Sequence, residues 1–127
     1  MRAILAVAAV LASLAAVPAA SAARPPTYVE KVTIMDAFNI PGRAFASSCV
    51  KILVSTVDAR WAMLTSPAKP PKVCVQNGQV GDGFVILSRA TKTSLRWTLR
   101  FEGSSEAAPC FVPRKVRADL LKNPACL

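Results

Sequence analysis

The residues of this sequence with the most chemical potential are four cysteines, Cys49, Cys74, Cys110 and Cys126. Cysteines can act as nucleophiles, bind metal ions or form disulfides. A metal site is disfavoured, because no two of the four form a C-x-x-C motif and the chain has no histidine. In an oxidising compartment an even number of cysteines favours two disulfides. Four cysteines allow three pairings, and we favour Cys49–Cys74 and Cys110–Cys126, which keep each bridge within a local unit.

The absence of histidine excludes every mechanism that needs a Ser-His or Cys-His pair or a histidine ligand. The acidic residues that remain outside the leader form no motif: Glu30, Asp36, Asp58, Asp82, Glu102, Glu106 and Asp119. Glu30 and Asp119 fit solvent-exposed helix positions, and Asp82 in Gly-Asp-Gly fits a turn. Asp58 fits a bend between strands, where its side chain can bind backbone amides. We therefore expect no catalytic site, no metal and no cofactor.

Basic residues outnumber acidic ones by 16 to 7, which gives a net charge of +9. Four of them would cluster on one hairpin: Arg89, Lys92, Arg96 and Arg100. Such a cluster could contact a polyanion, for example an anionic envelope polymer, although an ordinary solvated surface is the simpler interpretation. Trp97 and Phe101 alternate with the arginines and should point to the opposite side. We therefore expect no stacking platform for bases, and no nucleic-acid partner.

The first 22 residues have the features of a secretory signal peptide. Arg2 is a short positive region, an apolar core of small residues follows, and Ala20-Ser21-Ala22 is a typical cleavage site. The apolar core is too short for an ordinary membrane-spanning helix, and no later stretch is long enough. The sequence thus predicts a signal peptide at 1–22 and one secreted domain at 23–127, with no membrane anchor after cleavage.

Hydrophobic patterning predicts both helices and strands in the mature part. Helical spacing favours a helix over 28–38, and a short helix should begin near Pro113 and end before Pro124. Alternating or apolar runs predict strands at 49–57, 60–65, 84–89 and 95–101. The proline-rich stretch 66–72 fits a loop, and the chain near Cys74 a short extended segment.

The expected fold class is α+β: an antiparallel sheet of about four strands, an N-terminal helix, a short C-terminal helix and two disulfides. Sheets of this kind often bury one face and expose the other. We expect such a solvated face here.

Several stretches together resemble small exported proteins of actinobacteria: "VSTVDARWAML", "GDGFVILSR", "LRWTLRFEGSS" and "CFVPRKVRADL". The resemblance spans residues 48–127. That group has no established activity, so the resemblance implies export and a bacterial source and assigns no functional residue.

The function that these observations favour is a secreted, disulfide-stabilised, non-enzymatic domain that binds a partner in the envelope or outside the cell. A basic surface at Arg89, Lys92, Arg96 and Arg100 is the candidate contact. One alternative is an inhibitor of an extracellular enzyme that presents the loop 66–72. Another is a small hydrolase that depends on carboxylates.

Overall fold

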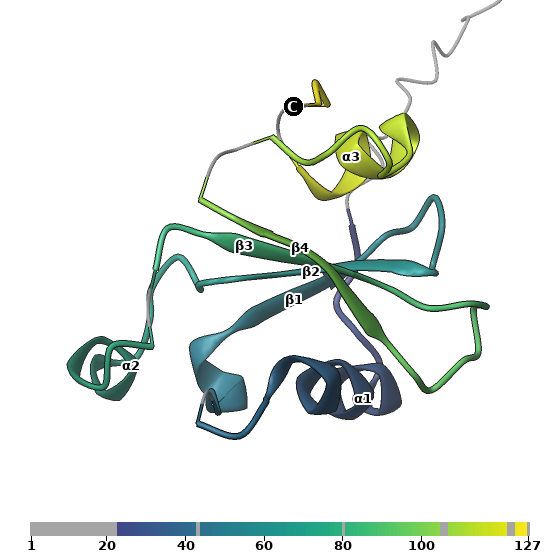
Figure 1. Cartoon of the computed structure of the whole chain (residues 1–127). Helices are drawn as coiled ribbons and strands as arrows, with labels where there is room; N and C mark the ends of the chain where they lie inside the picture. Colours follow the sequence, from purple (N-terminus) through teal and green to yellow (C-terminus); the bar gives the residue numbers. More distant parts are fainter. Residues whose placement is uncertain (1–22, 43, 80, 105–106, 122–123, 127) are drawn as a thin grey trace, which may run out of the picture.

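The structure, a computed structural model, describes residues 23–42, 44–79, 81–104, 107–121 and 124–126, and the predicted signal peptide lies outside them. The elements in chain order are α1 (Tyr28–Phe38), η1 (Ser47–Cys49), β1 (Lys51–Val54), β2 (Trp61–Thr65), α2 (Lys72–Gln76), β3 (Phe84–Ser88), β4 (Thr98–Gly103) and α3 (Arg114–Leu120) (Figure 1).

The four strands form one antiparallel sheet in the order β1-β2-β3-β4. The predicted fold class is confirmed, including both terminal helices and the disulfides Cys49–Cys74 and Cys110–Cys126. The helix α1 has the bounds that the sequence predicts. The last strand begins at Thr98, three residues later than predicted.

The expected extended segment near Cys74 is instead the short helix α2. Pro71 has φ −55° and ψ 147°, and its carbonyl accepts hydrogen bonds from the N–H groups of Cys74 and Val75. These local bonds satisfy a stretch of backbone that has no neighbouring strand. The prediction was therefore wrong because pairing partners, which a strand requires, are missing beyond the end of the sheet.

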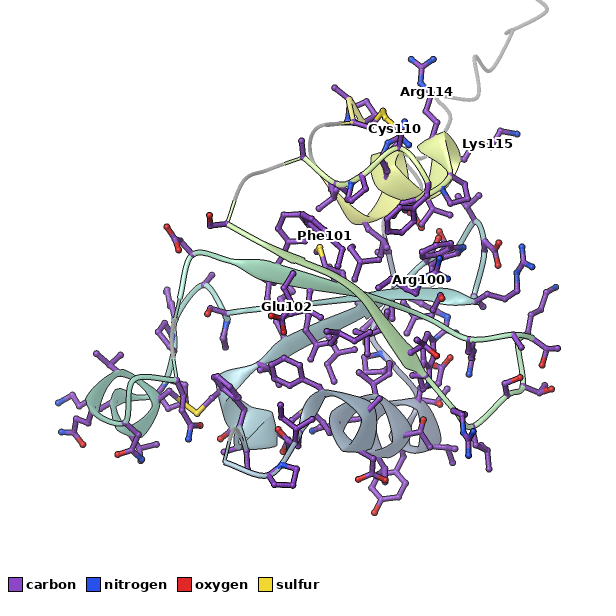
Figure 2. All side chains as sticks on the ribbon, in the orientation of Figure 1. Arg100, Phe101, Glu102, Cys110, Arg114 and Lys115 are labelled. Carbon is purple, nitrogen blue, oxygen red and sulfur yellow. A yellow bond between two sulfur atoms is a disulfide. The ribbon has the colours of Figure 1, made fainter. Side chains whose placement is uncertain are left out.

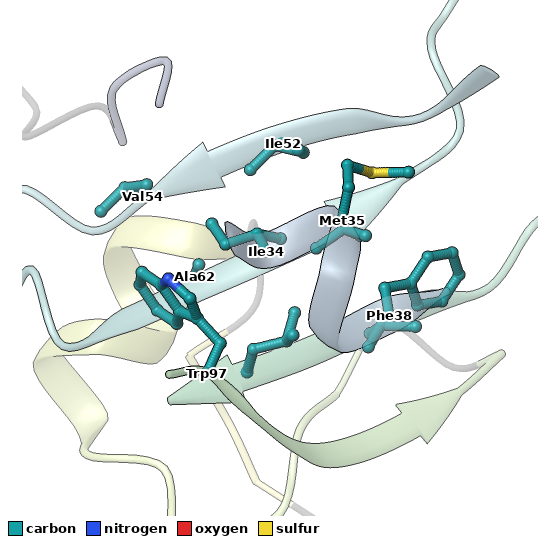
Figure 3. Packing of buried hydrophobic residues seen from close by; sticks show 10 residues of the cluster. Ile34, Met35, Phe38, Ile52, Val54, Ala62 and Trp97 are labelled. Carbon is teal, nitrogen blue, oxygen red and sulfur yellow. The ribbon is translucent and has the colours of Figure 1, made fainter. Parts of the chain in front are cut away.

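A buried core lies on each face of the sheet, although β4 stays largely exposed, so the expectation that one whole face is solvated is corrected. Ile52, Val54, Leu64 and Leu87 point toward α1 and pack with its buried side chains, as Figure 3 shows for several members of this core. On the other face, the alternate residues of β2 and β3 pack with Val112, Val116 and Leu120. These strand residues are Trp61, Met63, Phe84 and Ile86. Figure 1 places α1 and α3 on opposite sides of the sheet. The segment after β4 returns over the second face, which sequence periodicity could not reveal.

A register shift in β4 separates two aromatic residues that the sequence pattern placed together. Ile86 pairs with Phe101 and Leu87 pairs with Leu99, so Arg100 is an additional residue in β4. Such a bulge reverses the side-chain alternation on its far side. Trp97 consequently packs in the α1 core, whereas Phe101 packs against the α3 core. The expectation that they share one face was wrong for this reason.

Glu30 is buried, with only 5% of its surface exposed, and is not the solvent-exposed residue expected. Its carboxylate accepts hydrogen bonds from Arg24 at 2.7 and 3.1 Å, from Arg89 at 2.7 Å and from the Thr27 N–H at 2.9 Å. Burial disfavours the charged form of Glu30. The bonds from Arg24 and Thr27 and the charges of Arg24 and Arg89 outweigh it, so its pKa falls from 4.5 to about 2.

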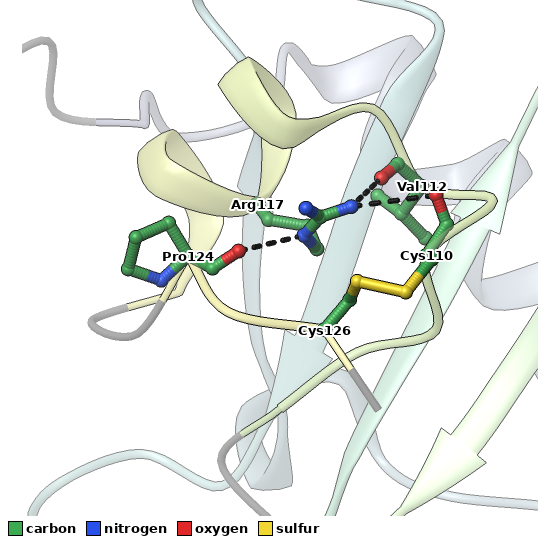
Figure 4. The surroundings of a disulfide bond; sticks show 5 residues. All are labelled: Cys110, Val112, Arg117, Pro124 and Cys126. Atoms are coloured by element: carbon green, nitrogen blue, oxygen red, sulfur yellow. Dashed lines mark hydrogen bonds between the residues drawn. A yellow bond between two sulfur atoms is a disulfide. The ribbon is translucent and has the colours of Figure 1, made fainter.

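The segment after β4 is fixed at its end by Arg117, which is itself buried. Its guanidinium donates to the carbonyls of Pro124 (2.8 Å), Cys110 (3.4 Å) and Val112, beside the Cys110–Cys126 disulfide (Figure 4). The C-terminal segment is therefore held by one covalent bond and by one charged group that satisfies several backbone oxygens.

Asp119 joins α3 to the turn between β1 and β2, although the sequence suggested an exposed helix position. Its carboxylate accepts from the Ser55 hydroxyl at 2.8 Å and from the Thr56 N–H at 2.7 Å. This contact bridges residues more than 60 positions apart in the chain. It completes the attachment of α3 to the sheet.

The Glu30 contacts predict a specific pH dependence. A carboxylate whose pKa is lower in the folded state stabilises the fold above its unfolded pKa of 4.5, and that stability is lost as the pH falls toward 2. We expect Glu30→Gln to lower the free energy of unfolding by about 3 kcal/mol near neutral pH. The difference from the natural protein should shrink as the pH falls.

Urea unfolding of both proteins over this pH range measures the effect. Asp36→Asn is the matched control, because Asp36 is an exposed acidic residue of the same helix. A constant difference between the natural protein and Glu30→Gln at all pH values would show that the Glu30 charge is not responsible.

Candidate binding site at one end of the sheet

A cleft of about 360 Å³ lies where β2 and β4 end and β3 begins. We call it the end cleft. Its lining is mostly apolar and comes from α1, the segment that follows α1, and the strand ends: Phe38, Phe45, Cys49, Val50, Leu64, Thr65, Ser66, Gln79, Gly81, Gly83, Phe84, Val85, Glu102 and Gly103. The volume is within the range of small-molecule sites in proteins.

Two phenylalanines form the wall of the end cleft on the α1 side. The rings of Phe38 and Phe45 have centroids 5.2 Å apart and are tilted by 43°. The side chain of Asn39 makes two hydrogen bonds with the backbone of Phe45. Its Nδ2 donates to the Phe45 carbonyl at 3.1 Å, and its Oδ1 accepts from the Phe45 N–H at 2.8 Å. The aromatic wall is thus positioned by hydrogen bonds as well as by packing.

The opposite wall is held by a disulfide and by one glutamine. Cys49–Cys74 links η1 to α2. Gln79 follows α2, and its side-chain carbonyl accepts from the Ala46 N–H at 3.1 Å. The Ser66 hydroxyl oxygen accepts from the Gly81 N–H at 3.0 Å. The disulfide and the Gln79 bond attach the β2–β3 connection to the segment that carries Phe45, and the Ser66–Gly81 bond joins the two ends of the connection to each other.

The described residues of that connection, 66–79 and 81–83, project beyond the end of the sheet, and we call them the β2–β3 excursion. In Figure 1 its helix α2 lies at the far left, away from the sheet. Val73 and Val75 are 52% and 59% exposed, and Lys69 and Lys72 beside them are also exposed. Because they are two residues apart on α2, Val73 and Val75 present two separate apolar contacts on this projecting, cross-linked segment.

The four basic residues proposed from the sequence are not brought together. Lys92 is exposed in the β3–β4 turn, and Arg96 is exposed near Asp36 and Trp97, with which it lines a shallow depression. Arg100 lies on the α3 side of the sheet, as Figure 2 shows. Its guanidinium is 5.7 Å from the Trp61 ring centroid. The four therefore do not form one continuous face.

Arg89 is buried and is occupied by structural contacts. It donates to Glu30 at 2.7 Å and to the Ala59 carbonyl at 3.0 Å. Its guanidinium also lies 4.4 Å from the centroid of the Trp97 ring, a cation–π contact. Without this side chain the buried Glu30 carboxylate would lose one of its partners. Arg89 therefore stabilises the folded state.

The acidic residues are dispersed as well. Asp58 binds the Arg60 guanidinium at 2.7 Å and the Arg60 N–H at 3.1 Å, which confirms the predicted amide contact at the bend. The Arg60 side-chain bond lowers the pKa of Asp58. In the part of the chain that the structure describes, no group of three acidic or cysteine side chains could hold a metal ion.

Sequence reasoning missed Glu30, Asn39, Phe45 and Gln79. A signal for Glu30 was present, because Thr27-Tyr28-Val29-Glu30 has the spacing of a capping box, and that box is formed. Asn39 directly after the helix is a weaker signal of side-chain to backbone bonding. Nothing local indicates that Gln79 reaches Ala46, 33 residues earlier.

Comparisons of the chain with family models, curated proteins and solved structures found no match. The resemblance to exported actinobacterial proteins stays a prediction. None of the helices in the described ranges has the length and apolar character needed to cross a membrane.

The Cys49–Cys74 disulfide should hold the end cleft and the β2–β3 excursion together. Replacing both cysteines by serine should cost about 3 kcal/mol of stability, because the bridge closes a loop of 25 residues. The nuclear Overhauser contact between Gln79 and Ala46 should also weaken. Chemical denaturation and NMR measure the two effects.

The control is the other bridge. Cys110→Ser with Cys126→Ser should lower stability by a similar amount but leave the Gln79–Ala46 contact intact. An unchanged contact after loss of Cys49–Cys74 would mean that this disulfide does not position the excursion.

Proposed function

We propose that this protein is an exported binding domain, not an enzyme, and that it uses the β2–β3 excursion to bind a protein outside the cell. The observation that carries the proposal is the exposure of Val73 and Val75 on a segment cross-linked to the core through Cys74. Export is supported by the leader sequence at 1–22 and by the two disulfides.

Preorganisation of the β2–β3 excursion supports a role in recognition. Pro67, Pro70 and Pro71 restrict the backbone before α2, and the Gln79 N–H closes the helix on the Cys74 carbonyl at 2.8 Å. A segment that is already ordered loses less conformational entropy when it binds. Such a segment binds a protein surface more tightly than a flexible loop of the same composition.

The charge of the molecule indicates the kind of partner. Lys69 and Lys72 flank the apolar pair, and the chain as a whole carries +9. An acidic protein surface with an apolar recess would complement this arrangement and would be attracted at long range. If that partner is an extracellular enzyme, the protein is an inhibitor, the alternative that the loop 66–72 suggested.

The other functions considered from the sequence have less support from the geometry. Contact with a polyanion would favour basic residues on one face, whereas Arg89 is buried and Arg96 and Arg100 lie on different sides of the sheet. A hydrolase would need convergent carboxylates. Glu30, Asp58 and Asp119 instead bond to separate structural partners. Glu106 lies outside the described residues.

The test uses the oxidised protein immobilised on a resin and the secreted and envelope fractions of its own source. We expect the resin to retain one acidic protein. Once purified, that protein should also bind the oxidised domain in solution. Val73→Asp with Val75→Asp should weaken that affinity at least about tenfold, because charges would replace the apolar contact.

Val29→Asp is the matched control, since Val29 is 53% exposed, like Val73, but lies on α1. It should leave the affinity unchanged. Equal binding by the excursion variant would contradict the proposal. Retention on a heparin-like resin that Arg96→Glu with Arg100→Glu abolishes would favour a polyanion partner instead.

A further inference from the structure

We infer that the end cleft is a binding site for a small neutral aromatic molecule of one or two rings that carries one hydrogen-bonding group. This goes beyond the proposed function, because the ligand would occupy the space between α1 and the strand ends and not the exposed surface of α2. The inference depends on the shape of the cleft, its lining and the polar atoms that face it.

The size and lining of the end cleft suit an aromatic ring. Its volume of about 360 Å³ exceeds what one or two rings require. Phe38, Phe45 and Phe84 line it together with Leu64 and Val85. Aromatic rings gain additional stabilisation from tilted or offset contact with other rings, and Phe38 and Phe45 already adopt a tilted arrangement.

The end cleft is formed before any ligand binds. Asn39 fixes Phe45, Gln79 holds Ala46, and Cys49–Cys74 ties the two walls together. Gly81 contributes open space to the lining, because a Cβ added there would meet no atom closer than 3.9 Å. Covalent and hydrogen-bonded walls prevent the collapse that would otherwise fill an apolar space of this size.

Two polar groups can orient the ligand. The oxygens of Ser66 and Gln79 accept backbone N–H groups, so the Ser66 hydroxyl hydrogen and the Gln79 amide hydrogens are available to donate. Among the described residues these hydrogens donate to no other group. A ligand hydroxyl or carbonyl oxygen would therefore find a donor beside an otherwise apolar surface.

A neutral ligand is favoured over an anion. None of the described residues that line the end cleft is a lysine or an arginine, so a carboxylate would be desolvated without an ionic partner. A cation would also have to lose its hydration in this mostly apolar cleft, a cost that a neutral ligand avoids. A neutral aromatic molecule with a hydroxyl group brings no charge into the cleft, and its oxygen can accept a hydrogen bond from Ser66 or Gln79.

The experiment compares three naphthalene probes with different charges: 2-naphthol, 2-naphthoate and 2-naphthylmethylammonium. Each is titrated into the oxidised, isotope-labelled protein and followed by NMR. We expect saturable binding of 2-naphthol, with shifts centred on Phe45, Leu64 and Val85. The two charged probes should bind at least about tenfold more weakly.

Gly81→Leu blocks the end cleft from its edge and introduces no steric conflict at Cβ. It should weaken 2-naphthol binding at least about tenfold. Ala68→Leu is the control, because Ala68 is an exposed small residue of the same excursion that does not line the cleft. It should bind 2-naphthol as the natural protein does.

Three results would overturn the inference: no saturation by 2-naphthol below about 5 mM, tighter binding of either charged probe, or shifts that map outside the end cleft. These outcomes are separate from the partner test. Val73→Asp with Val75→Asp should retain 2-naphthol binding, so failure of either proposal is seen independently of the other.

Discussion

The fold depends on one buried ionic contact, the Glu30 carboxylate between Arg24 and Arg89. Glu30 belongs to the first turn of α1, Arg89 follows β3, and Arg24 forms backbone bonds with Val54 at the end of β1. A single carboxylate therefore joins the N-terminal segment, the helix and the sheet. Because a buried charge that loses a partner is strongly destabilising, this contact favours the observed placement of α1.

The opposite end of the sheet is organised by covalent chemistry. There Cys49–Cys74 joins η1 to α2, and hydrogen bonds from Asn39 and Gln79 order the segment between α1 and η1. The apolar side chains at this end line the end cleft without filling it. A domain of this size has a limited core. Cross-links allow part of the surface to remain open for binding and still be ordered.

The ionic contact at Glu30 also explains why the sequence-based prediction of a basic binding surface was wrong. Arg89 looked like one of several surface charges, but it is the counter-ion of Glu30 and contacts Trp97. Arg96 and Arg100 looked like neighbours on one face, but Arg96 precedes β4 and lies beside Asp36 of α1, whereas Arg100 lies on the α3 side near Trp61. Two of the arginines, Arg89 and Arg117, are buried and make structural contacts. The net charge alone is therefore a poor guide to the binding surface.

The sequence by itself determined the α+β class, the bounds of α1 and the approximate positions of the strands, because periodicity and turn residues act locally. It favoured the disulfide pairing that the structure has, but it allowed two others. It also contained the capping box that begins α1. Only the tertiary structure decided that both faces of the sheet are buried, that Asp119 binds Ser55, and that Phe45 and Gln79 line one cleft. Those facts depend on contacts between residues far apart in the chain, and no local pattern specifies which distant segments meet.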